Sequence, residues 1–141
     1  MDHSKQQRIP RGIRNNNPLN IRVGNNWKGE VSHPTDHTFE QFTEMKWGCR
    51  AAFVILKNYI LRHKLNTIVK IVNRWAPSNE NNTQAYIASV VKYSLIKANE
   101  PIRFDNKCQM VNLFRGMCIV ENGKEVSIEA ILEGYDLACK K

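Results

Sequence analysis

The chain has 141 residues, of which 42% are hydrophobic and 24% are charged, a composition typical of a single soluble globular domain. It has 21 Lys and Arg against 13 Asp and Glu, so its net charge of +8 favours polyanionic partners. The cations are spread along the chain without a dense basic helix, which disfavours specific recognition of nucleic acid. No run approaches the roughly 20 apolar residues of a membrane span, so we expect no membrane insertion.

The first residues are predicted to lie outside the folded domain. Residues 1–10 are predicted to form a disordered basic arm. The arm has no apolar stretch, so it does not resemble a secretory signal, and we expect the chain to be synthesised in the cytoplasm. Residues 11–141 are predicted to form one domain. The four cysteines lack metal-ligand spacing, and we expect neither a metal nor a cofactor.

An unusual polar stretch follows, with the sequence RGIRNNNPLNIRVGNNW over residues 11–27. Asn and Gly tolerate left-handed backbone, and Pro18 excludes Asn17 from the α region. The amide side chains, Asn17 and Asn20 among them, provide many donors and acceptors for an uncharged polar ligand such as a glycan. The alternative is a loop whose side chains bond its own backbone before a strand begins.

Residues 20–42 alternate between apolar and polar side chains. Ile21 and Val23 precede a Gly-Asn-Asn turn, and Phe39 and Phe42 continue the pattern. This predicts a small antiparallel β-lobe of two or three strands that leans on helices, because short strands are marginal by themselves. If Phe39 points inward, Glu40 should face solvent.

Helical periodicity dominates the rest of the chain, so the predicted fold class is α+β, mostly α, with about five helices and one small antiparallel β-lobe near the N-terminus. The predicted helices cover residues 46–63, 67–75, 83–97, a range from Asp105 to Asn122, and a final range that begins at Ser127. Asn66, Asp105 and Ser127 are the expected N-caps. Gly123 is expected to end the fourth helix in a left-handed conformation.

Glu121 is the acid with the most informative position. It lies in the last turn of an apolar helix, where the helix dipole and burial both disfavour a charged carboxylate. A carboxylic acid that keeps its proton near neutral pH is the general acid that glycosidic-bond cleavage needs. The alternative is a solvent-facing glutamate beside a glycine stop.

Other candidate site residues are acids and aromatics in loops or at helix ends. Glu30 and Asp36 lie in the predicted β-lobe, where either could orient a water or stabilise a cationic centre, although both fit surface charges too. Glu80 precedes a helix, where it stabilises the helix N-terminus or lines a cleft. Trp27 and Tyr86 are candidates for glycan contact, with ordinary boundary packing as the alternative.

Together the motifs resemble those of short phage and prophage proteins that are described as virion structural proteins, some with a lysozyme-like fold. The resemblance covers about residues 11–139. Its motifs are RGIRNNNPLNIR, Trp27-Lys28-Gly29, Phe39-Glu40-Gln41-Phe42, GCRAA from Gly48, Trp75-Ala76-Pro77, ENNTQAYI from Glu80 and CIVENG from Cys118. It implies a lysozyme-like domain and, as partners, other virion proteins.

A fainter resemblance is to cell-wall glucosaminidases of the flagellar type. Residues 17–22 resemble their Asn-Leu-Phe-Gly-Ile-Lys turn, and residues 82–86 resemble a late motif that places Tyr86 at the active-site tyrosine. The catalytic helix of that family should precede Asn17, where only the arm stands. The helix that ends in Val120-Glu121-Asn122-Gly123 is similar to the missing element, so a circular permutation would return it to this turn.

These resemblances imply a peptidoglycan glycosidase of phage or prophage origin that acts at the cell wall or in the virion. Glu121 would be the general acid, Glu30 or Asp36 its partner, and peptidoglycan or another cell-wall glycan the ligand. A non-catalytic virion or wall-binding protein is the alternative. Nucleic-acid binding rests on net charge alone.

Overall fold

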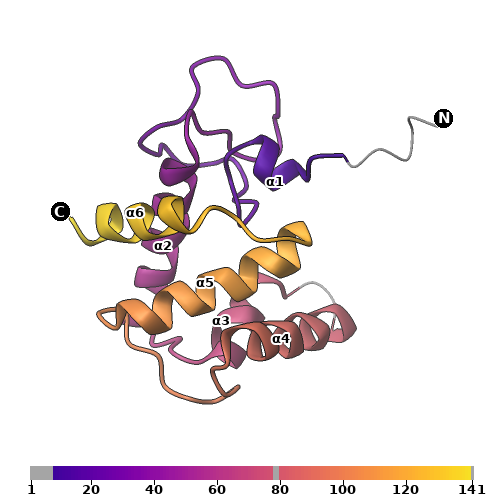
Figure 1. The fold of residues 1–141 in the computed structure, drawn as a ribbon, viewed down its shortest axis with the longest axis vertical. Helices are drawn as coiled ribbons and strands as arrows, with labels where there is room; N and C mark the ends of the chain where they lie inside the picture. The colour runs from indigo at the N-terminus through magenta and orange to yellow at the C-terminus, as the bar shows by residue number, and fades with distance from the viewer. Residues whose placement is uncertain (1–7, 78–79, 141) are drawn as a thin grey trace.

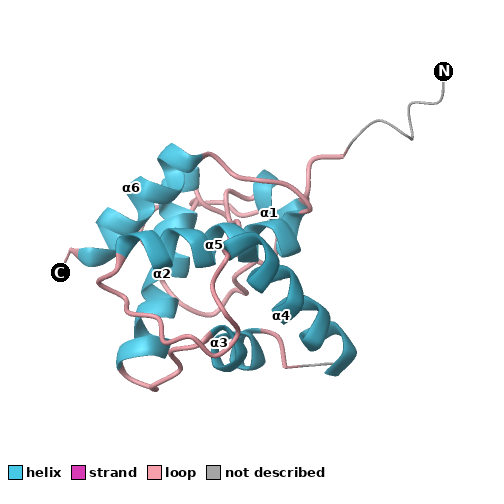
Figure 2. Ribbon diagram, turned by 60° about the horizontal axis from the view of Figure 1, so that its bottom comes forward, coloured by secondary structure: helices cyan, strands magenta, loops and turns pink. Residues whose placement is uncertain are grey.

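The computed structural model describes residues 8–77 and 80–140, and the regular secondary structure in this part of the chain is helical (Figures 1 and 2). The helices are α1 (Arg11–Arg14), α2 (Met45–Leu61), α3 (Ile68–Trp75), α4 (Glu80–Ser94), α5 (Lys107–Asn122) and α6 (Ile128–Cys139). None of these helices is long and apolar enough to cross a bilayer. Most of the predicted disordered arm, residues 1–7, lies outside the described residues.

Helices α2 to α6 fall on the five predicted ranges, with ends displaced by up to three residues, whereas α1 was not predicted. The caps explain where they begin. Ser127 caps α6 as expected, but Thr67 and Asn106 cap α3 and α5, each one residue later than predicted. Gly123 ends α5 with a φ of 73°, which confirms the expected left-handed stop.

The predicted antiparallel β-lobe is wrong, and with it the α+β, lysozyme-like fold class. Residues 15–43, here called the N-terminal loop lobe, contain no strand and pair only at isolated bridges, Arg22 with Phe39 and Glu30 with Phe42. Gly24 and Gly29 have φ angles of 145° and 84°, so the backbone turns away before either bridge extends into a ladder.

Asn17 replaces the missing strand pairing with side-chain hydrogen bonds. Its Nδ2 donates to the backbone oxygens of Ile21 at 2.9 Å and Glu40 at 3.0 Å, and its Oδ1 accepts from the Ile21 backbone N–H at 2.9 Å. Asn17 is fully buried. Side-chain bonds of this kind give the backbone an alternative to a strand ladder, and here they hold two loop segments together.

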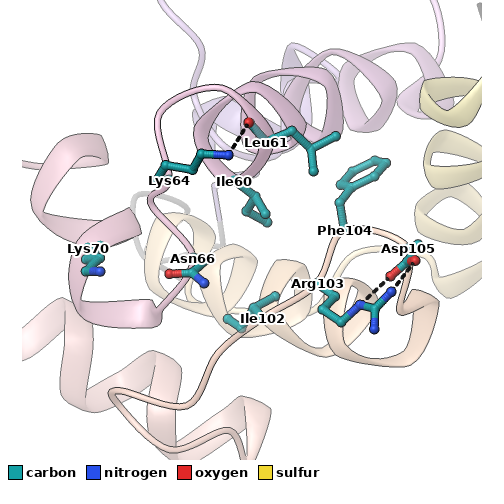
Figure 3. Close-up of a pocket in the computed structure, with 9 residues that line it drawn as sticks. All are labelled: Ile60, Leu61, Lys64, Asn66, Lys70, Ile102, Arg103, Phe104 and Asp105. Atoms are coloured by element: carbon teal, nitrogen blue, oxygen red, sulfur yellow. Dashed lines mark hydrogen bonds and ion pairs between the residues drawn. The ribbon is translucent and has the colours of Figure 1, made fainter.

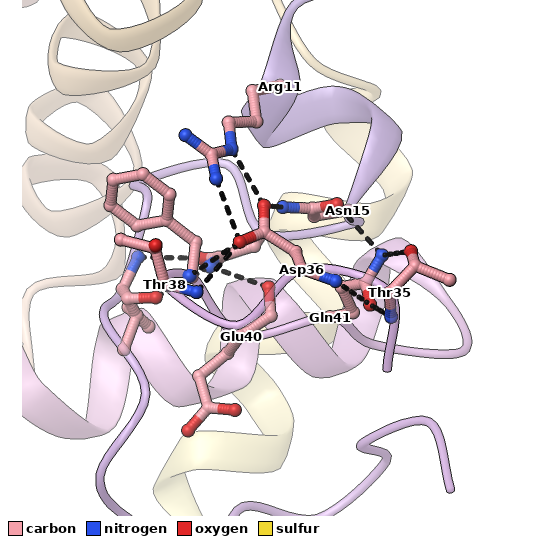
Figure 4. A network of polar contacts seen from close by, with 10 residues as sticks. Arg11, Asn15, Thr35, Asp36, Thr38, Glu40 and Gln41 are labelled. Carbon is pink, nitrogen blue, oxygen red and sulfur yellow. Dashed lines mark hydrogen bonds and ion pairs between the residues drawn. The ribbon is translucent and has the colours of Figure 1, made fainter. Parts of the chain in front are cut away.

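Asp36 fastens the outer side of the lobe (Figure 4). Its carboxylate accepts from the Arg11 guanidinium at 2.7 and 2.9 Å, from Asn15 Nδ2 at 2.9 Å, and from the backbone N–H groups of Thr38 and Phe39. The Arg11 hydrogen bond, together with these other donors, holds the pKa of Asp36 far below its usual range. Asp36 is therefore a charged anchor between the lobe and α1.

The core lies where α2, α5 and α6 meet. Phe53 of α2 stacks on Phe114 of α5 at 4.3 Å between ring centroids, and meets the Tyr135 ring of α6 edge-on at 5.4 Å. Figure 1 shows α5 crossing between the α2–α6 pair and the α3–α4 pair. Because α5 also contacts α1, its C-terminal end is positioned against the N-terminal segment of the chain.

Candidate active site

Glu121 lies in the last turn of α5 and is hydrogen-bonded by residues from two other parts of the chain. Its Oε1 accepts from Asn20 Nδ2 at 2.8 Å, and its Oε2 accepts from the Tyr86 hydroxyl at 3.0 Å. Asn20 belongs to the N-terminal loop lobe and Tyr86 to the buried face of α4. The structure thus brings together three of the residues that the sequence nominated.

The environment of Glu121 is that of a proton-holding acid. Burial raises the pKa of Glu121 above its ordinary value, and the hydrogen bonds from Asn20, Tyr86 and the Trp75 side chain oppose that rise without cancelling it. Among the ion pairs of the described residues, none involves Glu121. Its surroundings therefore supply dipolar donors and no counter-charge. The carboxyl can give up a proton and leave an anion that neighbouring donors already solvate.

Asn20 reaches Glu121 because of an unusual backbone conformation. Its φ is 53°, in the left-handed region, and its backbone N–H donates to the Asn17 carbonyl at 3.0 Å. Asn is one of the few residues besides Gly that adopt this region readily. The buried Asn17 below it fixes the turn, so the asparagine run builds the geometry that aims Asn20 at Glu121.

Asn122 locks the same end of α5 to the start of the chain. Its Nδ2 donates to the Pro18 carbonyl at 2.8 Å and to the Cys118 carbonyl at 3.1 Å. Gly12 of α1 packs against it so closely that an added Cβ would lie 2.5 Å from Asn122 Oδ1. Neither residue was predicted to belong to the site, because a contact over 104 positions leaves no local pattern.

Two neighbouring carboxyls, Glu30 and Glu40, belong to the N-terminal loop lobe. Glu40 is only 8% exposed, and the inward Phe39 on which a solvent-facing Glu40 depended is not observed. The outward side chain is Phe39, which is covered by the guanidinium groups of Arg11 and Arg22 at 4.6 and 5.2 Å. Figure 4 shows the Glu40 carboxyl pointing away from the Asp36 network.

Glu40 is paired with Glu30. Burial, followed by the hydrogen bond with Glu30 and its charge, raises the pKa of Glu40 to about 7. Glu30 Oε1 is buried without a hydrogen-bond partner among the described residues, and so is Nε1 of Trp27. Buried polar atoms are normally paired, so these two atoms are candidates for contact with a polar ligand.

The remaining nominated residues are placed differently. Asp36 and Asn17 use their polar atoms to hold the loop lobe together, and within the described residues no hydrogen bond or ion pair joins either of them, or Glu30, to Glu121. Glu80 is the first residue of α4, and its side chain lies outside the described part of the structure. Within the described ranges, His, Cys, Asp and Glu side chains form no group of three that could hold a metal.

Comparison with known proteins identifies a relative of this chain. No established family profile matches the chain. It is similar to Protein P5 of Pseudoalteromonas phage PM2, with 35% identity over 131 residues, which covers 89% of this chain and 80% of that protein. The aligned length includes most of the folded domain and both halves of the Glu121 site. The chain therefore belongs to the family of phage proteins that includes Protein P5.

Proposed function

We propose that the chain is a structural component of a phage or prophage virion. The observation that carries this proposal is its 35% identity, over nearly the whole chain, to a protein of a phage. Its partners would be other virion proteins, and its action would take place in the particle or at the host cell wall. The test is to purify particles of the phage or prophage that encodes the chain, and to look for it by mass spectrometry. The chain should co-purify with intact particles, and its recovery only among free proteins would contradict the proposal.

A second function, cleavage of a cell-wall glycan, is favoured by the contacts of Glu121. In this mechanism the protonated Glu121 gives its proton to the glycosidic oxygen as the bond from that oxygen to the anomeric carbon breaks. A water, or a hydroxyl of the sugar itself, then supplies the oxygen that bonds to the anomeric carbon and releases a proton. Asn20 and Tyr86 would stabilise the Glu121 carboxylate, because both already donate to it.

The partner acid and the glycan contacts remain proposals. Glu30 fits the partner role better than Asp36, because Asp36 is held by Arg11 and further donors, whereas one Glu30 oxygen is unpaired. Trp27 has a buried indole N–H without a partner and is our proposed glycan contact. We assign Asn17 to shaping the turn beneath Asn20.

The test compares wild type with Glu121→Gln on purified peptidoglycan, and measures turbidity and soluble glycan fragments by mass spectrometry. Loss of a general acid should lower fragment release by at least about 100-fold. Glu133→Gln is the matched control, because that side chain is exposed and lies on α6. If wild type binds peptidoglycan but releases no fragments, the cleavage proposal is overturned. That result would support a virion protein that binds the cell wall.

A further inference from the structure

A concave site that does not include Glu121 lies between the end of α2, the loop before α3 and the segment before α5. It is a pocket of about 620 Å³, within the range of roughly 300–1,000 Å³ that is typical of small-molecule sites. Its apolar lining consists of Ile60, Ile102 and Phe104, which are largely buried, and of Leu61, which is 53% exposed (Figure 3). None of its lining residues belongs to the Glu121 site.

Hydrogen bonds hold the backbone of the residues that line this pocket. The Ile102 backbone N–H donates to the Asn66 carbonyl at 2.7 Å, and the Arg103 backbone N–H donates to Gln109 Oε1 at 3.0 Å. The Tyr135 hydroxyl donates to the Phe104 carbonyl at 2.6 Å. The pocket is therefore largely pre-formed, and a ligand would pay little to order it.

Cations surround the apolar surface. Lys64 and Lys70 line the pocket, and neither forms an ion pair with any described residue. Arg103 is paired with Asp105 at 2.8 Å, so the two lysines supply the uncompensated charge. Lys64 also has a φ of 59°, a conformation that disfavours a lysine and would suit glycine. A lysine therefore stands at the rim despite its backbone cost.

We infer that this pocket binds a single acyl chain that carries an anionic head group. The apolar surface would hold the chain, while Lys64 and Lys70 would contact the carboxylate or phosphate. Charge complementarity selects an acidic head, and the apolar floor disfavours free phosphate or a sugar as the occupant. The inference is independent of the Glu121 site, so either can fail without the other.

The experiment is displacement of dansyl-undecanoate from the full chain by ten-carbon competitors that differ only in the head group. Decanoate should compete best, decanol less well, and decyltrimethylammonium least. Raising the salt concentration should weaken the binding of decanoate. Inorganic phosphate alone should not compete. Equal competition by decanoate and decyltrimethylammonium, or failure of the probe to bind, would overturn the inference.

Variants distinguish the head-group contacts of the two lysines from effects on the backbone and on net charge. Lys64→Gly and Lys70→Ala should each lower the affinity for decanoate about threefold, and together about tenfold, as expected for exposed charge contacts. Leu95→Gly is the backbone control, because Leu95 is also left-handed, with a φ of 62°, and lies outside the pocket. Lys124→Ala is the charge control. Unchanged decanoate affinity in the double variant would contradict the proposed head-group contacts.

Vesicles distinguish a bilayer lipid from a free amphiphile. Co-sedimentation with phosphatidylglycerol vesicles but not phosphatidylcholine vesicles, reduced in the double variant, would identify an anionic membrane lipid as the source. Decanoate binding without co-sedimentation would identify a free acyl anion. Both results support the same pocket chemistry.

Discussion

Glu121 is surrounded by donors rather than by cations, and the balance between these donors and burial sets the direction in which its pKa moves. Asn20, Tyr86 and Trp75 donate to its carboxyl, yet burial still raises its pKa. A raised pKa means that the folded chain favours the protonated acid. Its contribution to stability is present below the unfolded-state pKa and is lost as the pH rises through the folded-state pKa.

Replacement of Glu121 by Gln should therefore change how stability depends on pH. The variant keeps a neutral side chain at every pH, so its free energy of unfolding should rise relative to wild type as the pH increases from 4 to 8. Urea unfolding at several pH values measures this difference. A constant difference across that range would contradict a raised pKa of Glu121.

Glu40 should also make the folded chain less stable as the pH rises, for a separate reason. Its pKa of about 7, against a model-compound value of 4.5, reflects burial and the neighbouring Glu30. Wild type should lose about 3 kcal/mol of stability between pH 4.5 and 8 that Glu40→Gln does not lose. Thermal unfolding of both proteins at pH 5 and pH 8 tests this. Parallel pH profiles would contradict the raised pKa of Glu40.

The pairing of α2 with α6 depends on one glycine. Gly134 has no room for a side chain, because an added Cβ would collide with the Cβ of Cys49 on α2. Gly134→Ala should cost about 1–3 kcal/mol of stability through overpacking. Gly116→Ala on α5 is the comparison, since its added Cβ would lie 3.2 Å from the Val90 carbonyl oxygen. Urea unfolding should show the larger loss for Gly134→Ala, and the reverse order would contradict this packing.

Local patterns predicted the helices because their information is local. Apolar periodicity and single capping residues such as Ser127 and Gly123 are visible within a few positions of each helix end. The same reasoning failed for residues 20–42, where the alternation of Ile21 and Val23 suggested a strand. The pairing there depends on the Asn17 side chain and on Gly24, which override strand propensity.

The candidate site was predictable only in part for a related reason. Glu121, Asn20 and Tyr86 were nominated from their residue types and local positions, and each also belongs to a motif that the resemblance uses. Their mutual contact spans up to 101 positions and could not be read from spacing. Asn122 and Glu40 also lie in these motifs, but no role was predicted for either, and their contacts became visible only from the fold.

The Glu121 site forms where the N-terminal loop lobe meets the C-terminal end of α5, two parts that are distant in the chain. Figure 1 shows α1, at the start of the described chain, near α5, and the bonds from Asn20 to Glu121 and from Asn122 to Pro18 lie at this junction. This contact is the one that the proposed circular permutation requires. The permutation itself remains a prediction.

Asn122→Ala should weaken this junction. It removes hydrogen bonds from a buried amide to the Pro18 and Cys118 carbonyls, at a cost of about 1–3 kcal/mol. Asn112→Ala makes the same substitution on the same helix without these bonds. Hydrogen exchange should show faster opening of residues 15–22 in Asn122→Ala than in Asn112→Ala. Equal exchange in both would contradict the role of Asn122.

Net charge acts over the whole surface. With a charge of +8, the chain should bind anionic peptidoglycan more weakly as salt rises. Glu121→Gln should bind as wild type does, because attraction arises from many lysines and arginines. Co-sedimentation with peptidoglycan between 50 and 500 mM salt measures both effects. Salt-independent binding would contradict an electrostatic origin.

Fragment release from purified peptidoglycan tests most directly whether Glu121 is an acid that cleaves glycan. Wild type and Glu133→Gln should lower the turbidity and release soluble glycan, while Glu121→Gln should bind without release. Equal release by wild type and Glu121→Gln would contradict the central role of Glu121.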